Sequence, residues 1–142
     1  MSARLAKGEK LPPVLLPGIA QTAIEAYLVA SGDDNPLHRD PELALAAGLA
    51  DVPVPGMLVL AHLAEYLGQW PECRRIAALS GRFVSPVLVA RPIRIEARIM
   101  AIDTSAGTAT LRITAAQEDR LAVLAEARLL VRLEGRLAQA AP

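Results

Sequence analysis

The chain has 142 residues, a length that fits one domain with a full hydrophobic core. Its composition is 53% hydrophobic and only 3% aromatic, so the core must be built from Ala, Leu, Val and Ile. Basic and acidic residues number 15 each, and this balance argues against a nucleic-acid-binding protein and against a protein bound to a membrane surface.

The apolar runs are interrupted well short of the ~20 residues that a membrane span needs. Residues 1–10 carry charges with no apolar block behind them, so we expect no signal peptide. Cys73 is the only cysteine, which excludes an internal disulfide and fits a reducing cytoplasm. The two histidines are far apart in the sequence and no cysteine cluster or glycine-rich nucleotide loop accompanies them, so we expect neither a metal nor an organic cofactor.

The first elements are predicted by their prolines, caps and spacing. We expect residues 1–10 to form a flexible tail. Leu11–Ile19 predicts an edge strand, because the three prolines within it cannot donate to a sheet ladder. Thr22 and Glu25 have the spacing of a capping box, which predicts a helix that begins at Thr22 and ends at Gly32.

Two further helices are predicted downstream. Asp40–Pro41 is a favourable start for a short helix that Gly48 would end. Met57–Leu67 is apolar on nearly all sides, which is typical of a buried helix. We expect Gly68–Arg75 to be a loop.

The second half of the chain has the sequence pattern of an antiparallel sheet. Polar turns are predicted at Asp103–Gly107 and Gln117–Arg120, between runs rich in Ile, Val, Leu and Thr. These runs are Ile76–Val84, Val87–Ile102, Gly107–Ala116 and Leu121–Leu133. The element order predicts an α+β fold in which a buried helix lies against a curved antiparallel sheet, as one domain with a frayed tail at residues 137–142.

The stretch Ser31–His38 carries the strongest candidates for chemistry. Asp33 and His38 lie on a connection stiffened by Gly32 and Pro36, which holds two side chains at a set separation. Histidine, with an ordinary pKa near ~6.5, exchanges protons at neutral pH, and a carboxylate can hold or activate a water. The alternative is an ordinary turn in which Asp and Asn are favoured for their backbone geometry and His38 merely precedes the next helix.

A longer pattern around this stretch resembles a known motif. It reads Tyr27-x-x-x-Ser31-Gly32-Asp33-x-Asn35-Pro36-Leu37-His38-x-Asp40-Pro41, and it continues with Pro55-Gly56-Met57 and Arg82-Phe83-x-x-Pro86-Val87. This pattern resembles the hydratase motif of the MaoC-like family, the (R)-specific enoyl-CoA hydratases of the hot-dog fold. The resemblance implies a long central helix wrapped by an antiparallel sheet, a dimer, and a tunnel for an acyl chain.

The resemblance also implies roles for individual residues. Asp33 and His38 would position and deprotonate a water that adds to C3 of a trans-2-enoyl thioester, and would deliver a proton to C2. The Gly56 N–H would face the thioester oxygen at the start of the buried helix, where donors are free and negative charge is favoured. Asn35 would orient the loop or bind the thioester. CoA or an acyl-carrier protein would then be part of the substrate.

Several weaker candidates accompany these residues. Side chains that could line the substrate pocket are Pro55, Met57, Tyr27 and His62, although a histidine or tyrosine in such a place is more often a packed core residue. Arginines that could meet CoA phosphates are Arg82 and Arg91, because the guanidinium matches phosphate geometry, although each is more often a solvated charge.

Two departures from the family pattern keep alternatives open. Pro55 stands where the family usually has His, and Val89-Ala90-Arg91-Pro92 replaces a Gly-Asp turn. A hot-dog thioesterase and a non-catalytic acyl-binding or partner subunit of a dehydratase are the rival interpretations. The order of Asp33, Asn35 and His38 argues against the first, and the intact Asp–His pair argues against the second.

Overall fold

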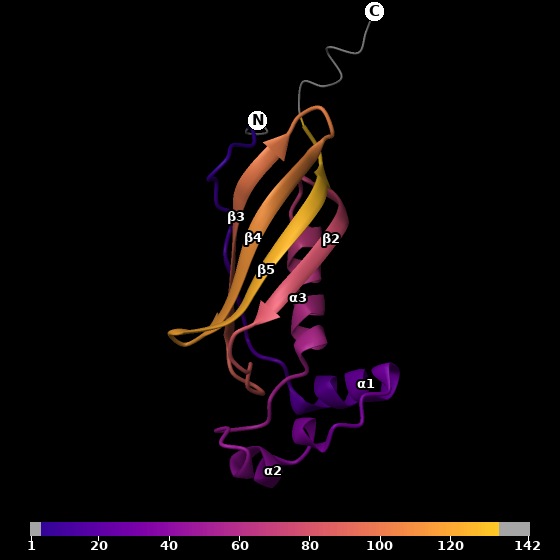
Figure 1. Cartoon of the computed structure of the whole chain (residues 1–142), viewed down its shortest axis with the longest axis vertical. Helices are drawn as coiled ribbons and strands as arrows, with labels where there is room; N and C mark the ends of the chain where they lie inside the picture. The colour runs from indigo at the N-terminus through magenta and orange to yellow at the C-terminus, as the bar shows by residue number, and fades with distance from the viewer. Residues whose placement is uncertain (1–3, 134–142) are drawn as a thin grey trace, which may run out of the picture.

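The computed structural model describes residues 4–133 and shows a curved antiparallel sheet laid around one long helix (Figure 1). The strands are β1 Val14–Leu16, β2 Cys73–Phe83, β3 Ile93–Asp103, β4 Thr108–Gln117 and β5 Arg120–Val131. The helices are α1 Gln21–Ser31, the 3₁₀ turn η1 Pro36–His38, α2 Pro41–Ala46 and α3 Gly56–Gln69. The predicted α+β hot-dog architecture is confirmed.

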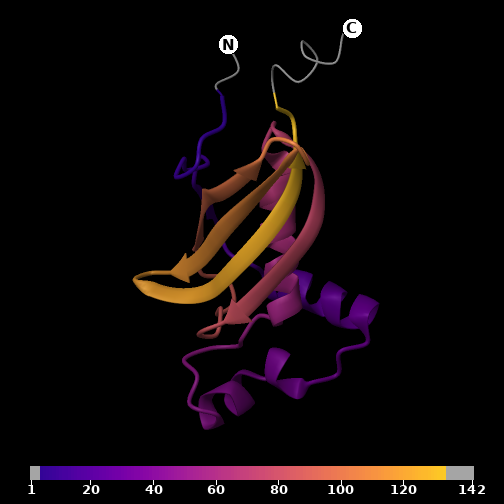
Figure 2. The same ribbon diagram turned by 45° about the horizontal axis from the view of Figure 1, so that its top comes forward.

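The sheet order is β1-β3-β4-β5-β2, and every neighbouring pair is antiparallel. The two predicted polar turns close the β3–β4 and β4–β5 hairpins, and short β1 lies at one edge as predicted. The views in Figures 1 and 2 show the sheet curving around α3, while α1 and α2 lie beyond the end of the sheet at which α3 begins. This arrangement leaves β2 as the opposite edge strand.

One face of the sheet is buried against α3. Along β3 from Ile93 to Ile99 the side chains alternate, with Ile and Ala inside and the charged residues outside, which is the period-two pattern of a half-buried strand. Every third or fourth residue of α3 faces the same interior. The central members of this core include Val59, Leu63, Leu67, Ile93, Ile95, Ile99, Leu111, Ile113, Val123 and Leu129.

The prediction that the long helix is buried on all sides is wrong. Only Val59, Leu63 and Leu67 of α3 are buried, and Met57 is 59% exposed, because the sheet covers one face of the helix and leaves the other open. The predicted loop Gly68–Arg75 is also shorter than expected. The helix continues to Gln69 and β2 begins at Cys73, so three residues, 70–72, connect them.

The predicted capping box at the start of α1 is wrong. The helix is capped at Ala20, and no side chain forms the cap. Ile19, which is buried, accepts a hydrogen bond from the Ala90 N–H at 2.8 Å, so tertiary contacts fix where the chain turns into the helix. Glu25 instead forms an ion pair with Arg39, its Oε2 lying 2.9 Å from the arginine Nε.

The third predicted strand begins later than expected, at Ile93 instead of Val87. Pro92 cannot donate to a ladder, and Ala90 adopts a left-handed backbone with φ 58°. The segment before them leaves the sheet and pairs with residues 52–54, through the bridge between Pro53 and Leu88.

The expectation of a flexible tail does not hold for the last residues of the 1–10 segment. Gly8 donates to the Ile99 carbonyl at 2.7 Å, and Lys10 forms a bridge with Arg98 beside β3. The predicted tail at 137–142 lies outside the described residues. Among residues 4–133, no helix has both the length and the apolar character that crossing a membrane requires.

Candidate active site

The loop between α1 and α2 is held by caps made of its own side chains. Gly32 ends α1 in the left-handed conformation at φ 74°, which glycine adopts without strain. The Asn35 side chain accepts the Leu37 N–H at 3.1 Å and so begins η1. Asp40 caps α2 by accepting the N–H groups of Glu42 and Leu43, and Pro41 occupies the first helical turn, as predicted. These bonds fix the positions of Asp33 and His38 on the loop.

His38 is oriented by a backbone carbonyl. Its Nδ1 lies 2.7 Å from the Pro53 oxygen. Because a carbonyl only accepts, Nδ1 carries the hydrogen, and in the neutral ring Nε2 is then left with a free lone pair. The His38 side chain is only 14% exposed, so the ring is held in this orientation by its surroundings.

The segment that carries the Pro53 carbonyl is held by backbone hydrogen bonds to residues 87–89. Val54 donates to the Val87 carbonyl at 2.7 Å, and Val89 donates to the Val52 carbonyl at 2.9 Å. In extended pairing the polar groups of successive residues alternate in direction, so the Pro53 carbonyl is turned away from that partner and toward His38.

The Gln117 side chain holds the segment that pairs with residues 52–54. It is 7% exposed, and its Oε1 accepts the Leu88 N–H at 2.7 Å. Its Nε2 donates to the carbonyls of Leu88 and Arg91, at 3.0 and 3.1 Å. The sequence showed Gln117 only as the start of a turn. Its inward position on an otherwise alternating strand was the signal that could have identified it.

Asp33 faces the free nitrogen of His38. Its Oδ2 lies 3.8 Å from His38 Nε2, and its Oδ1 accepts the Asn35 N–H at 3.0 Å. The Asp33 side chain is 35% exposed, so solvent reaches the pair. A separation of 3.8 Å is too long for a direct hydrogen bond, but one water can bond to both atoms across it. The structure therefore brings the predicted side chains of Asp33 and His38 close enough for one water to bond to both.

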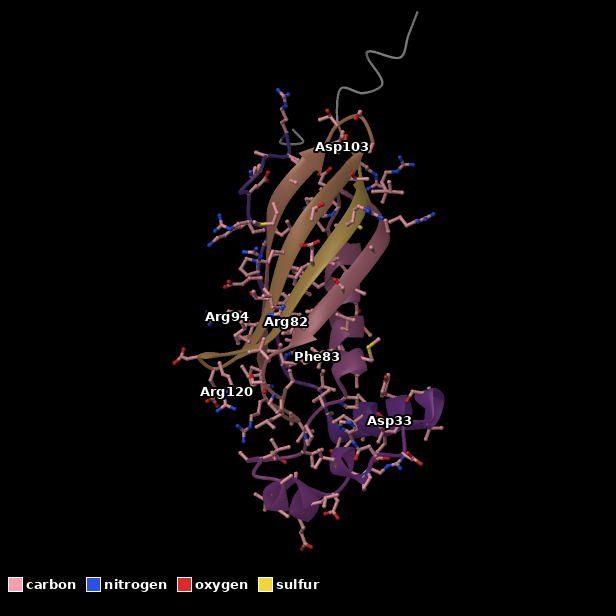
Figure 3. All side chains as sticks on the ribbon, viewed as in Figure 1. Asp33, Arg82, Phe83, Arg94, Asp103 and Arg120 are labelled. Carbon is pink, nitrogen blue, oxygen red and sulfur yellow. The ribbon has the colours of Figure 1, made fainter. Side chains whose placement is uncertain are left out.

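The first residue of α3, Gly56, comes three residues after Pro53, whose carbonyl orients His38. Gly56 and Met57 belong to the first helical turn, whose N–H groups have no partner within the helix. Within residues 4–133 no acceptor is bonded to the Gly56 N–H. Figure 3 shows Phe83 where the sheet ends beside the start of α3, and Asp33 beyond that end, next to α1. The helix start thus offers a free donor on the same end of the fold as the Asp33–His38 pair.

A groove of about 440 Å³ runs along Gly56. We call it the Gly56 groove, and its lining contains no charged side chain. Met57 and Pro53 line it, together with the end of β2 and the segment that follows. The lining residues are Pro53, Val54, Gly56, Met57, Val59, Phe83, Val84, Ser85, Pro86 and Val87. An apolar ligand group fits this surface.

Of the other predicted pocket residues, Pro55 lies beside Gly56, whereas Tyr27 and His62 do not line the groove. Pro55 is buried and forms the N-cap position of α3. Tyr27 is half-buried and packs against the core. The Nδ1 of His62 lies 3.8 Å from Glu65 on the same helix, and His62 does not line the Gly56 groove. The structure therefore places Met57 and Pro55 beside Gly56, and it does not bring Tyr27 or His62 to that groove.

The two arginines proposed for CoA phosphates do not line one groove. Arg82 is exposed near the end of β2. Arg91 lines a second groove of about 460 Å³, together with Arg120, Glu118 and Asp119. Both grooves include Ser85 and Pro86 in their walls, so they adjoin.

Two further titratable residues lie away from the pair. Burial, and secondarily the charge of Glu96, raises the pKa of Tyr66, whose hydroxyl donates to the Pro12 carbonyl at 2.9 Å. Burial likewise raises the pKa of the Cys73 thiol, the opposite of what a nucleophilic cysteine needs. Within the described part of the chain no three His, Cys, Asp or Glu side chains gather as a metal site requires.

The sequence of this chain is similar to those of known proteins. A family model described as "MaoC like domain" matches residues 7–118. A protein of Streptomyces avermitilis described as "UPF0336 protein" is 30% identical over 100 residues, which cover 68% of this chain and 67% of that protein.

Solved structures resemble this one along most of its length. A "MaoC-like dehydratase" superposes with a TM-score of 0.80 at 25% identity over 88% of this chain, which spans only 40% of that longer protein. A structure described as "(R)-hydratase from A. caviae involved in PHA biosynthesis" superposes with a TM-score of 0.78 at 27% identity, covering 93% of this chain and 99% of that one.

Proposed function

Because this chain belongs to the MaoC-like domain family, we propose that it is a hydratase that adds water to trans-2-enoyl thioesters with (R) stereochemistry. In the reverse direction it would dehydrate (R)-3-hydroxyacyl thioesters. The observation that carries this proposal is the pairing of Asp33 Oδ2 with the free Nε2 of His38 across 3.8 Å. A structural relative of similar length is described as an (R)-hydratase, which supports the same reaction class.

The proposed reaction consumes one water and forms two bonds. A water held between Asp33 and His38 gives a proton to the pair as its oxygen bonds to C3 of the enoyl group. The electron pair of the C2–C3 double bond moves toward C1, and negative charge builds on the thioester oxygen. A proton from the pair then bonds to C2, so the elements of water have added across the double bond.

The Gly56 N–H would stabilise the charge that develops on the thioester oxygen. A backbone donor at a helix N-terminus points out of the helix and lies at the positive end of its dipole. Removing one such donor from other enzymes costs about 100- to 1,000-fold in rate. Pro55, which stands in place of the family's usual histidine, leaves this donor intact because it removes only a side-chain group and its own N–H.

The surroundings of the Gly56 groove support a dimer as part of the proposal. Met57, Phe83 and Val84 are 59%, 48% and 53% exposed around it, and β2 is an edge strand. A second copy of the chain packed along β2 would enclose this groove and shield its apolar rim from bulk solvent. We propose a cytoplasmic homodimer, with CoA or an acyl-carrier protein as the thioester carrier and no further cofactor. Contacts of Arg82 or Arg91 with the carrier phosphates stay predictions.

A non-catalytic partner subunit is the second candidate, and Pro55 favours it. The proline cannot supply the hydrogen bonds of the imidazole that the family usually has beside the site. A thioesterase is the third candidate, because an Asp–water pair can also attack a thioester carbonyl.

One assay separates the three functions. We expect the wild-type protein to remove the enoyl absorbance of crotonyl-CoA without releasing free thiol, which is followed in parallel. Thiol release in step with substrate loss would instead identify a thioesterase. No change in absorbance with crotonyl-CoA or with longer enoyl-CoA substrates would contradict the hydratase proposal and support the partner-subunit interpretation.

A further inference from the structure

Phe83 is the last residue of β2, and its ring lies directly over Gly56. A Cβ added to Gly56 would come within 2.8 Å of the ring Cζ and 2.9 Å of Cε1, so no side chain larger than hydrogen fits beneath the ring where it stands. The same ring is 48% exposed and forms part of the wall of the Gly56 groove. Phe83 therefore touches the helix start and the open groove at once.

The base of this aromatic side chain is fixed by the sheet. Phe83 pairs with Val123 of β5, and the next residue, Val84, donates to the Ala122 carbonyl at 2.8 Å. The ring can turn about its own bonds, but its attachment point does not follow it. The wall beside Gly56 therefore depends on which side chain stands at position 83.

In the proposed reaction, the reacting end of the thioester would lie beside this wall. When the thioester oxygen accepts the Gly56 N–H, the carbonyl carbon is one bond from that oxygen and C2 is one bond further. A ring close enough to exclude a Cβ at Gly56 would then be within reach of a substituent on C2. The groove lining carries no charge, so such a substituent meets only apolar atoms and is accepted or rejected by its size.

We propose that Phe83 is a specificity-determining residue that selects unbranched enoyl thioesters over those with a methyl group at C2. The inference rests on the proposed hydratase function and adds to it the class of substrate that the site rejects. Rejection comes from overlap with the ring, and the accepted substrate has only hydrogen at C2.

The test compares crotonyl-CoA with 2-methylcrotonyl-CoA. We expect the ratio of their kcat/KM values to fall by at least about 10-fold in Phe83→Ala, since one methyl group in an apolar pocket is typically worth about 10- to 200-fold. Phe83→Leu, which keeps more of the packing, should shift the ratio in the same direction by less. Leu15→Ala is the matched control, because Leu15 is 63% exposed on β1 at the opposite edge of the sheet.

Binding without turnover separates this inference from the hydratase proposal. Calorimetric titration with butyryl-CoA and 2-methylbutyryl-CoA should show the same shift in relative affinity in the two Phe83 variants. Wild-type hydration of crotonyl-CoA with an unchanged ratio in both variants would overturn the role of Phe83 alone. A protein that hydrates nothing but still shows the binding shift would overturn the reaction and keep the role of Phe83. An equal shift in Leu15→Ala, or a loss of dimer in sedimentation that accounts for the change, would overturn the role of Phe83 as well.

Discussion

Replacing His38 with glutamine is expected to lower kcat for crotonyl-CoA hydration by about 100- to 10,000-fold, the usual contribution of a positioned acid–base group. Glutamine keeps polarity and approximate length but has no nitrogen that accepts and returns a proton near neutral pH. The fold should survive, because within residues 4–133 His38 makes one side-chain hydrogen bond, to the Pro53 carbonyl, and it lies on a loop whose caps come from other residues.

His62→Gln is the comparison for this experiment, since it makes the same chemical change at the only other histidine. Its side chain faces Glu65 on the surface of α3, so we expect kcat to stay within a few-fold of the wild-type value. Steady-state kinetics on both variants, with circular dichroism to confirm folding, give the answer. Equal losses in the two variants, or full activity in His38→Gln, would contradict the assignment of His38.

Replacing Leu63 with alanine is expected to lower the free energy of unfolding by about 2–5 kcal/mol, as large-to-small changes in closed cores do. Leu63 has 0% exposure, lies midway along α3 and belongs to the cluster that joins this helix to the sheet. Because the sheet holds its curve through hydrogen bonds on both sides of most strands, the cavity left by the lost side chain cannot close fully.

Guanidinium unfolding at one fixed protein concentration measures this loss, since an oligomer's apparent stability depends on concentration. Val29→Ala on α1 is the control, because Val29 is 79% exposed and should change the free energy of unfolding by less than about 0.5 kcal/mol. A Leu63→Ala midpoint equal to that of the wild type, with an unchanged denaturant slope, would show that α3 is not the centre of the core.

The features that could be predicted from the sequence are those that one element specifies by itself. The polar turns at Asp103–Gly107 and Gln117–Arg120 were predictable, because polar residues between runs rich in Ile, Val, Leu and Thr mark such turns locally. The cap at Asp40 and the left-handed end at Gly32 were also predictable, because local hydrogen bonding and local backbone freedom decide them. The MaoC-like motif added the hot-dog topology, which no local pattern contains.

The predictions that failed depended on contacts distant in sequence. The capping box at Thr22 was locally well formed, but the buried Ile19 and its bond to Ala90 set the N-cap of α1 at Ala20, two residues before Thr22. The strand expected from Val87 was apolar enough to form, yet Pro92 and the side chain of Gln117 direct that segment away from β3. The hydrophobic face of α3 was overestimated, because apolar composition does not show which side the sheet covers.

In the candidate site, too, the motif identified some residues, whereas contacts distant in sequence determine the others. Asp33 and His38 were identified from the motif, and the structure places them 3.8 Å apart. The Pro53 carbonyl that fixes the histidine tautomer has no sequence signal, because any residue has a carbonyl. Phe83 was visible in the motif, but its contact with Gly56 depends on how the end of β2 meets the start of α3.

The central claim is that Asp33 and His38 act on one water as a unit, and the rates of Asp33→Asn, His38→Gln and the double variant test it most directly. If both side chains hold the same water, losing either disables the step, and the double variant should be no more than a few-fold slower than the slower single variant. Losses of crotonyl-CoA hydration that multiply in the double variant would show two independent contributions and contradict the account.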